Sequence, residues 1–393
     1  MPKFKRLLSF LLALCALLPV TSAASFTAEA IAPFPSVSAR AAILTLDDGE
    51  TVIYNKDANV RLPMASTTKI MTALVAAELA SFDTPITVDA QAVGTEGSSV
   101  YLVAGEVLTL EQLLYALLLE SANDAAVAIA IALSGSVDAF AEQMNKKARD
   151  LGLSDTHFEN PHGLDGESHY TTAADLAKIA CAVLKEPRLR TIVSSRKATI
   201  PHPDTDTDRL LVNHNKLLRL YDGCIGVKTG YTQRSGRCLV SAAERDGVTL
   251  VAVTLNASND WEDHSQLLDY GFSLYSSRDL CAAGELTHPL PLVGGTDAYV
   301  LLSNVHSVSV TLPRSATDID LRIECRPFEY ATVTEGEHLG DAVFLCDTNG
   351  DGSREALARV PLLAVCTVEK RTKKISLWSW ILRLFGKDTT ENG

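Results

Sequence analysis

The sequence has no Cys-x-x-Cys pair, and the cysteines downstream of Cys15 are odd in number: Cys181, Cys224, Cys238, Cys281, Cys325, Cys346 and Cys366. This usage indicates neither a disulfide framework nor a zinc site. Most of these cysteines are expected to be small buried apolar residues. A single bridge among the last three stays open if the protein is exported.

Basic residues are also few, with 35 Lys and Arg against 48 Asp and Glu, which gives a net charge of −13. A phosphate-binding protein needs a concentrated basic surface, so this balance argues against nucleic acid as a partner. The chain has 393 residues and 47% hydrophobic content. That length and composition favour two or three globular domains with buried cores.

No apolar run is long enough to cross a bilayer comfortably, and the longest N-terminal one covers residues 7–20. Lys3, Lys5 and Arg6 precede this run, and small residues follow it. The order is that of a secretory signal peptide, predicted over residues 1–24 with cleavage after Ala23 or Ala24. An uncleaved anchor is the alternative. Residues 25–37, with two prolines, are interpreted as a linker.

Residues 38–286 are predicted to form one α/β (α+β) domain. Residues 41–46 and 51–54 flank an Asp-Asp-Gly-Glu turn, which predicts a β-hairpin. Helical periodicity follows at 108–119 and 125–133, and a capping box at Thr172 begins another helix. Strand-like runs at 224–227, 238–243 and 249–255 precede a closing helix at 263–274. We expect an antiparallel sheet flanked by helices, in which the early strands join the late ones.

Residues 287–368 contain short alternating segments and are predicted to form a small all-β domain. Asp347 to Gly352 resembles the start of a calcium loop, but the twelfth position is Ala358 instead of Glu. A hairpin turn is therefore the preferred interpretation.

The C-terminal segment, residues 369–393, carries an amphipathic pattern at 373–387. One helical face would hold Trp378, Ile381, Leu382 and Phe385. A helix over 375–385 would be only about 16 Å long, so we expect it to lie in the plane of a membrane surface. A helix docked on the protein itself is the alternative.

One candidate for chemistry is the pair Ser66 and Lys69, which follows Pro63 and leads into an apolar run. Proline at a helix start places Ser66 in or beside the first turn, and a spacing of three puts the hydroxyl and the amine on one face. The same spacing recurs at Ser194 and Lys197. The pair alone is therefore a weak signal.

Two further motifs favour the pair at Ser66 over the pair at Ser194. Ser121-Ala122-Asn123 and Lys228-Thr229-Gly230 each occur once, and both follow Ser66, whereas only the second follows Ser194. A serine nucleophile needs a base, and Lys69 can act as one if burial and the Lys228 cation lower its pKa. Ser121 would relay a proton, and the Asn123 amide would hold a peptide backbone.

The last motif would supply the rest of a binding site. Lys228 and Thr229 suit a carboxylate, and Gly230 allows close approach of substrate backbone. Backbone N–H groups of Ser66 and Tyr231 could hold an oxyanion. The predicted substrate is a peptide-like acyl donor with a free carboxylate. We expect no metal site in the loop that carries His157, His162 and His169, because their spacing fits no common ligand pattern and favours a structural role.

The three motifs resemble the active-site triplet of penicillin-binding proteins and serine β-lactamases. Residues 41–272 are similar to the low-molecular-mass penicillin-binding proteins, the D-alanyl-D-alanine carboxypeptidases, in these stretches: 97–99, 105–106, 121–125, 160–164, 213–215, 228–232 and 267–272. The resemblance implies the transpeptidase-like fold of that family and removal of the terminal D-alanine from peptidoglycan pentapeptide stems without metal or cofactor. It also implies covalent inhibition by β-lactams and a position at the outer face of the cytoplasmic membrane.

One departure concerns the loop before the closing helix, where some members carry a carboxylate-binding Arg. Here residues 259–263 contain none, so Arg234 or Arg237 would have to assist Lys228 and Thr229. The alternatives are a D,D-endopeptidase, a class A β-lactamase with Glu159 as its deacylating base, and a catalytically inactive wall-binding protein.

Overall fold

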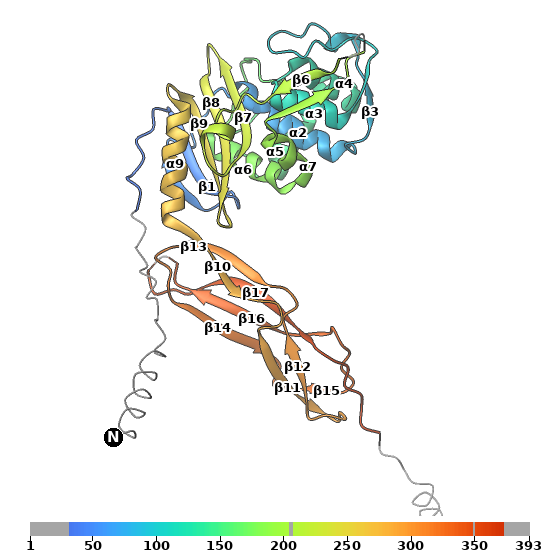
Figure 1. Ribbon diagram of the computed structural model, residues 1–393, viewed down its shortest axis with the longest axis vertical. Coiled ribbons are helices and arrows are strands. Elements are labelled where there is room, and N and C mark those ends of the chain that lie inside the picture. The colour runs from blue at the N-terminus through green and yellow to red at the C-terminus, as the bar shows by residue number, and fades with distance from the viewer. Residues whose placement is uncertain (1–30, 204–206, 349, 373–393) are drawn as a thin grey trace, which may run out of the picture.

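The computed structural model describes residues 31–203, 207–348 and 350–372, which form two bodies joined end to end (Figure 1). We call residues 38–274 the N-terminal body and residues 275–372 the β domain. The predicted signal peptide, residues 25–30 of the linker and the amphipathic tail at 373–387 lie outside the described residues.

The N-terminal body is built on an antiparallel sheet with the strand order β2-β1-β9-β8-β7. Its strands are β1 (Ala41–Leu46), β2 (Val52–Lys56), β7 (Cys224–Thr232), β8 (Gly236–Arg245) and β9 (Val248–Ala257). The predicted hairpin is confirmed as β1 and β2. The predicted joining of early and late strands is confirmed as well, because Ile43 of β1 lies opposite Val253 of β9.

Helices cover both faces of this sheet (Figure 1). On one face α9 buries Leu267 and Leu268 against Leu44 and Leu250, while Ile43 points to the opposite core. That larger core holds residues of α2 to α7. The helices are α2 (Lys69–Leu79), α3 (Leu110–Leu119), α4 (Asn123–Ser134), α5 (Val137–Asp150), α6 (Ala173–Lys185), α7 (Pro187–Ser194), α8 (Leu217–Leu220) and α9 (Asp260–Leu274).

Short elements complete this body: the 3₁₀ helices η2 (Ala65–Thr68) and η3 (Ala90–Ala92), and the strand pairs β3 (Pro85–Thr87) with β4 (Val107–Thr109) and β5 (Lys197–Ile200) with β6 (Arg209–Val212). In the described ranges no single helix is both long and apolar enough to cross a bilayer, and α4 and α5 pass that test only as a pair bent by 85°.

The β domain has its own core, which includes Leu290, Leu302, Phe344 and Leu362. Its strands are β10 (Tyr275–Cys281), β11 (Thr287–Val293), β12 (Tyr299–Ser303), β13 (Val308–Pro313), β14 (Ile319–Cys325), β15 (Glu329–Tyr330), β16 (His338–Cys346) and β17 (Glu355–Ala364). The main sheet has the order β14-β16-β17-β12-β11-β15. The predicted C-terminal all-β domain is confirmed, and β10, which precedes residue 287, pairs with β13.

Two local expectations concern this domain. The segment from Asp347 connects β16 to β17 as a hairpin, and the Asp347 carboxylate accepts the backbone N–H groups of Gly350 and Gly352 at 2.6 and 2.8 Å. The cysteines in the described residues are free. Cys325 lies opposite Gly340 and Cys346 lies opposite Ile319, so these two thiols sit at opposite ends of one strand pair.

Candidate active site

Ser66 lies in the 3₁₀ turn η2, directly before α2, as the position of Pro63 predicts. The turn is tight because two other backbone segments press against it. A Cβ at Gly230 would come within 3.1 Å of the Ser66 nitrogen, and a Cβ at Gly163 would lie 2.0 Å from the Ala65 carbonyl oxygen. Ala65 itself has a φ of +48°, a strained value for a residue with a side chain. Only glycine fits at 163, and a side chain at 230 would be crowded.

The Lys69 amine lies beneath this turn, fully buried. Its Nζ is 3.0 Å from Ser66 Oγ, 2.7 Å from Asn123 Oδ1 and 2.5 Å from the His162 carbonyl oxygen. Burial, and secondly the charge of Lys228, hold the pKa of Lys69 well below its ordinary value. The structure thus provides both conditions that favour the neutral amine, the form of lysine that can accept a proton.

Ser121 lies in the short connection between α3 and α4, and Asn123 is the first residue of α4. Ser121 has a φ of +62° and is nearly buried, and its hydroxyl has no hydrogen-bond partner among the described residues. The Asn123 amide contacts Lys69 through Oδ1 and donates from Nδ2 to the Glu96 carbonyl at 2.6 Å. One N–H of this amide therefore remains for a ligand.

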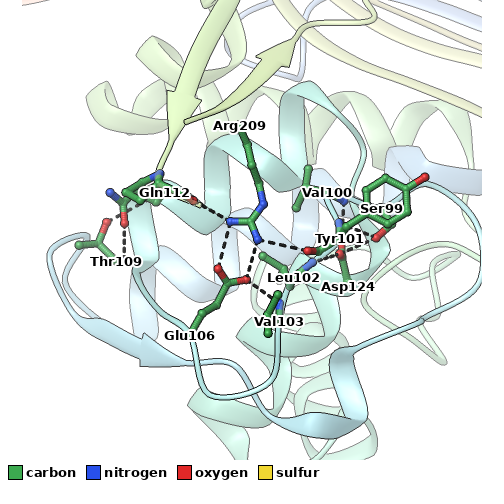
Figure 2. A network of polar contacts seen from close by, with 11 residues as sticks. Ser99, Val100, Tyr101, Leu102, Val103, Glu106, Thr109, Gln112, Asp124 and Arg209 are labelled. Atoms are coloured by element: carbon green, nitrogen blue, oxygen red, sulfur yellow. Dashed lines mark hydrogen bonds and ion pairs between the residues drawn. The ribbon is translucent and has the colours of Figure 1, made fainter. Parts of the chain in front are cut away.

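A loop over residues 96–106 holds this connection in place (Figure 2). The Asp124 carboxylate accepts the Ser99 hydroxyl at 2.6 Å and the Leu102 N–H at 3.0 Å. Farther along, Glu106 accepts two hydrogen bonds from Arg209 of β6, at 3.0 and 3.1 Å. The Asn123 N–H donates to the Ser98 carbonyl at 2.7 Å, so the loop and the motif are directly connected.

Lys228, Thr229, Gly230 and Tyr231 lie within β7, the last strand in the sheet order, beside η2. The Thr232 N–H donates to Ser235 Oγ at 3.0 Å, on the side of the β8 hairpin. Because N–H groups alternate along a strand, we infer that the Tyr231 N–H points away from β8, to the edge of the sheet where η2 packs. Lys228 is buried, and burial lowers its pKa to about 7.

A cleft of about 610 Å³ lies between these elements, and five of the predicted site residues line it: Ser66, Ser121, Thr229, Gly230 and Tyr231. Lys69, Asn123 and Lys228 lie buried behind it. The wall is completed by Ser98, His214, Arg237, Asp260 and Trp261.

The two arginine candidates differ in position. Arg237 donates from Nε to Asp260 Oδ1 at 2.8 Å, beside Trp261 in the cleft wall. Arg234 donates instead to the Gly166 carbonyl at 2.8 Å and does not line the cleft. Asp260 is thus the first residue of α9, in the stretch 259–263 that contains no Arg, and it orients an arginine that comes from β8.

The residues that offered alternative interpretations of the sequence do not line the cleft. Ser194 ends α7 and donates to the Thr191 carbonyl at 3.1 Å, while Lys197 begins β5. Glu159 accepts the Ser168 N–H at 3.1 Å and does not line the cleft. His169 contacts Thr68 Oγ1 at 2.8 Å through Nε2 and accepts the Glu159 N–H at 3.0 Å, so it connects its loop to the nucleophile turn.

The sequence did not predict four features that position the active-site groups: the His162 carbonyl, Asp124, the Glu106–Arg209 pair and Asp260. The stretches that contain His162, Asp124 and Glu106 are among those that resemble the family, which was their only signal. Arg209 and Asp260 carry no local pattern that marks them.

Comparison with known proteins agrees with this geometry. The profile of peptidase family S11, D-alanyl-D-alanine carboxypeptidase, matches residues 27–259. The chain is 32% identical to D-alanyl-D-alanine carboxypeptidase DacF of Bacillus subtilis, over 88% of this chain and 89% of the relative. It is 28% identical to DacC of Escherichia coli, over 98% of both chains.

Solved structures show the same fold. The Streptomyces K15 DD-transpeptidase has a TM-score of 0.59 at 33% identity, covering 62% of this chain and all of that one. Penicillin-binding protein 5 of Haemophilus influenzae has a TM-score of 0.65 at 24% identity, covering 86% of this chain and 99% of that one. With the family profile spanning more than half of its length, this chain belongs to the D-alanyl-D-alanine carboxypeptidase family of serine peptidases.

Proposed function

We propose that this D-alanyl-D-alanine carboxypeptidase works through an acyl-enzyme on Ser66. The observation that carries the proposal is the position of the buried Lys69 amine, 3.0 Å from Ser66 Oγ. The substrate class implied by the family is the peptidoglycan pentapeptide stem, with its terminal D-alanyl-D-alanine.

The three contacts of Lys69 support a base with a defined orientation. A neutral amine has two N–H bonds and one lone pair. The Asn123 and His162 oxygens can only accept, so they take the two N–H groups. The lone pair is then left for the Ser66 hydroxyl, which donates its proton to Lys69 as the oxygen attacks the substrate carbonyl.

The tetrahedral oxyanion formed by this attack would accept the backbone N–H groups of Ser66 and Tyr231. As the oxyanion collapses, the C–N bond to the terminal D-alanine breaks. The proton held by Lys69 passes to the leaving amine through the Ser121 hydroxyl, which no described residue engages in a hydrogen bond. Water then attacks the ester, which releases the shortened stem and restores the Ser66 hydroxyl.

The substrate carboxylate would bind between Thr229 and Arg237, with Lys228 behind them. Arg237 is half-exposed, and its guanidinium is bonded to Asp260 on one side only. A guanidinium has five donors, so an ion pair with Asp260 leaves others to reach the ligand. This arrangement would replace the Arg that some family members place before the closing helix.

Among the alternatives, the class A β-lactamase is not favoured, because Glu159 is bonded within its own loop away from the cleft. The inactive wall-binding protein is not favoured either, because all three motifs converge on one cleft. β-Lactams would bind in the same cleft and acylate Ser66. For location, residues 1–24 and 373–387 support export and peripheral attachment to the outer face of the cytoplasmic membrane.

The test labels the protein with fluorescent penicillin and measures D-alanine release from a pentapeptide in parallel. Ser66→Ala should lose both signals, whereas Ser194→Ala, the matched copy of the Ser-x-x-Lys spacing, should keep both. Equal labelling of wild type and Ser66→Ala would refute Ser66 as the nucleophile. Labelling without D-alanine release would point to another acyl donor.

A further inference from the structure

Three neighbouring strands at one edge of the β domain have an apolar face that no described residue covers. Residues Leu290, Leu292, Val300 and Leu302 of β11 and β12 point into the core. Alternate residues point the opposite way and are exposed: Pro289, Pro291, Val293, Tyr299, Leu301 and Tyr330. A sheet face in contact with water normally carries polar residues, so this face is unusual.

The strand register makes these residues one continuous surface. Pro289 lies opposite Leu301, Pro291 opposite Tyr299, and Val293 opposite Tyr330. Tyr299 is 58% exposed and Tyr330 63% exposed. Residues paired in this way share a face and stand about 5 Å apart, so their side chains adjoin. We call this surface the β11–β12–β15 face.

The face lies at the end of the β domain far from the N-terminal body, where the described chain ends (Figure 1). The Arg371 N–H donates to the Gly294 carbonyl at 2.8 Å, and the Thr296 N–H donates to the Glu369 carbonyl at 2.9 Å. The chain therefore leaves the domain beside Val293. Exposed Lys370 precedes this exit, and Lys373 and Lys374 follow it in the sequence.

We propose that the β11–β12–β15 face is a lipid-contact surface whose partner is an anionic phospholipid bilayer. Tyrosine has an apolar ring and a polar hydroxyl, a combination that suits the boundary between headgroups and acyl chains. The basic residues at the exit suit anionic headgroups. The same charges would repel a second copy placed against this end, which argues against a dimer interface.

The inference rests on the proposed membrane attachment of residues 373–387 and adds to it. A tail alone would act as a tether that leaves the enzyme free to turn. A second contact in the β domain would fix its orientation, so that the cleft is held at a constant direction relative to the membrane. The apolar face and the tail would then bind as two linked sites on one surface, which raises the overall affinity.

The test uses the mature full-length chain and vesicles of equimolar phosphatidylglycerol and phosphatidylcholine. The triple variant Val293→Ser, Tyr299→Ser, Tyr330→Ser removes the face. The matched control Leu220→Ser, Val305→Ser, Leu321→Ser removes three apolar residues of similar exposure elsewhere. We expect the vesicle partition coefficient to fall about tenfold in the first variant and to stay within twofold in the control. Equal partition of both variants would overturn the proposal.

Three further readouts separate other outcomes. Fluorescent-penicillin labelling should stay unchanged in both triple variants, so failure of the lipid surface is distinguishable from failure of the active site. A lipid-free dimer that the triple variant dissociates would overturn the proposal in favour of a second copy. Trypsin cleavage at Lys373 and Lys374 is also compared without lipid. Faster cleavage in that variant would mean that the β11–β12–β15 face binds the C-terminal tail and not lipid, which would overturn the proposal. The variant Ile381→Asp, Phe385→Asp tests the tail by itself and should also lower partition.

Discussion

Replacing Glu106 by Gln should destabilise the N-terminal body far more than a conventional surface substitution. The side chains of Glu106 and Arg209 are 3% and 8% exposed, and two hydrogen bonds join them. The neutral amide would leave the guanidinium buried without its counter-charge, although Arg209 keeps its bonds to the Tyr101 and Pro201 carbonyls. Breaking one side of a buried pair costs about 3–5 kcal/mol. For a body of this size that is a fall in Tm of roughly 6–20 °C.

The control is Asp155→Asn, which breaks the Arg61–Asp155 pair, whose side chains are 54% and 41% exposed. An exposed pair contributes about 0–1 kcal/mol. Calorimetry on the mature protein would measure both variants, with the N-terminal transition identified by its upward shift after penicillin binding. The double variant Arg209→Met, Glu106→Leu should cost less than the sum of the single changes. Equal Tm values for Glu106→Gln and Asp155→Asn would refute the reasoning.

Two other predictions concern the cleft. Lys69 acts as a base only when neutral, so the penicillin acylation rate should rise with pH through the pKa of Lys69. The variant Lys228→Gln removes a cation that lowers this pKa, so its rise in rate should move to higher pH. A pH profile from stopped-flow labelling measures it, and an unmoved profile would contradict the role given to Lys228. Arg237→Gln should raise KM for the pentapeptide about tenfold or more through loss of a charge-assisted bond. Arg234→Gln should stay within twofold in the same D-alanine release assay, and similar KM values for the two variants would rule out Arg237.

Much of the fold follows from local patterns. The Asp-Asp-Gly-Glu turn predicts the β1–β2 hairpin, the capping box predicts the start of α6 at Thr172, and the alternation after residue 287 predicts a β domain. These patterns work because each depends on residues close together in sequence. The closing helix was predicted to begin at residue 263 but begins at Asp260. Its first turn is mostly polar, so the apolar periodicity does not extend to its start.

The site was predictable only as far as its motifs. Ser66, Ser121 and Thr229 line one cleft, but their spacing does not reveal that the His162 carbonyl orients Lys69. A main-chain carbonyl has no residue type to recognise. Gly230 illustrates a different limit. It was assigned to substrate approach, but a Cβ there would also lie 3.1 Å from backbone atoms of Met64, Ser66 and Thr67 in the nucleophile turn. Such contacts join distant segments and leave no periodic trace.

The pairing of β1 with β9 also bears on how the protein reaches its native state. Ile43 lies opposite Val253 in the middle of the sheet, so the β1–β2 hairpin can complete its pairing only after β9, which is synthesised much later. Topologies dominated by such distant pairings fold slowly. Until β9 arrives, β1 presents an unpaired edge that invites intermolecular association. Truncations that end before residue 248 should therefore accumulate as insoluble chains, whereas loss of the β domain alone leaves the sheet of the N-terminal body complete.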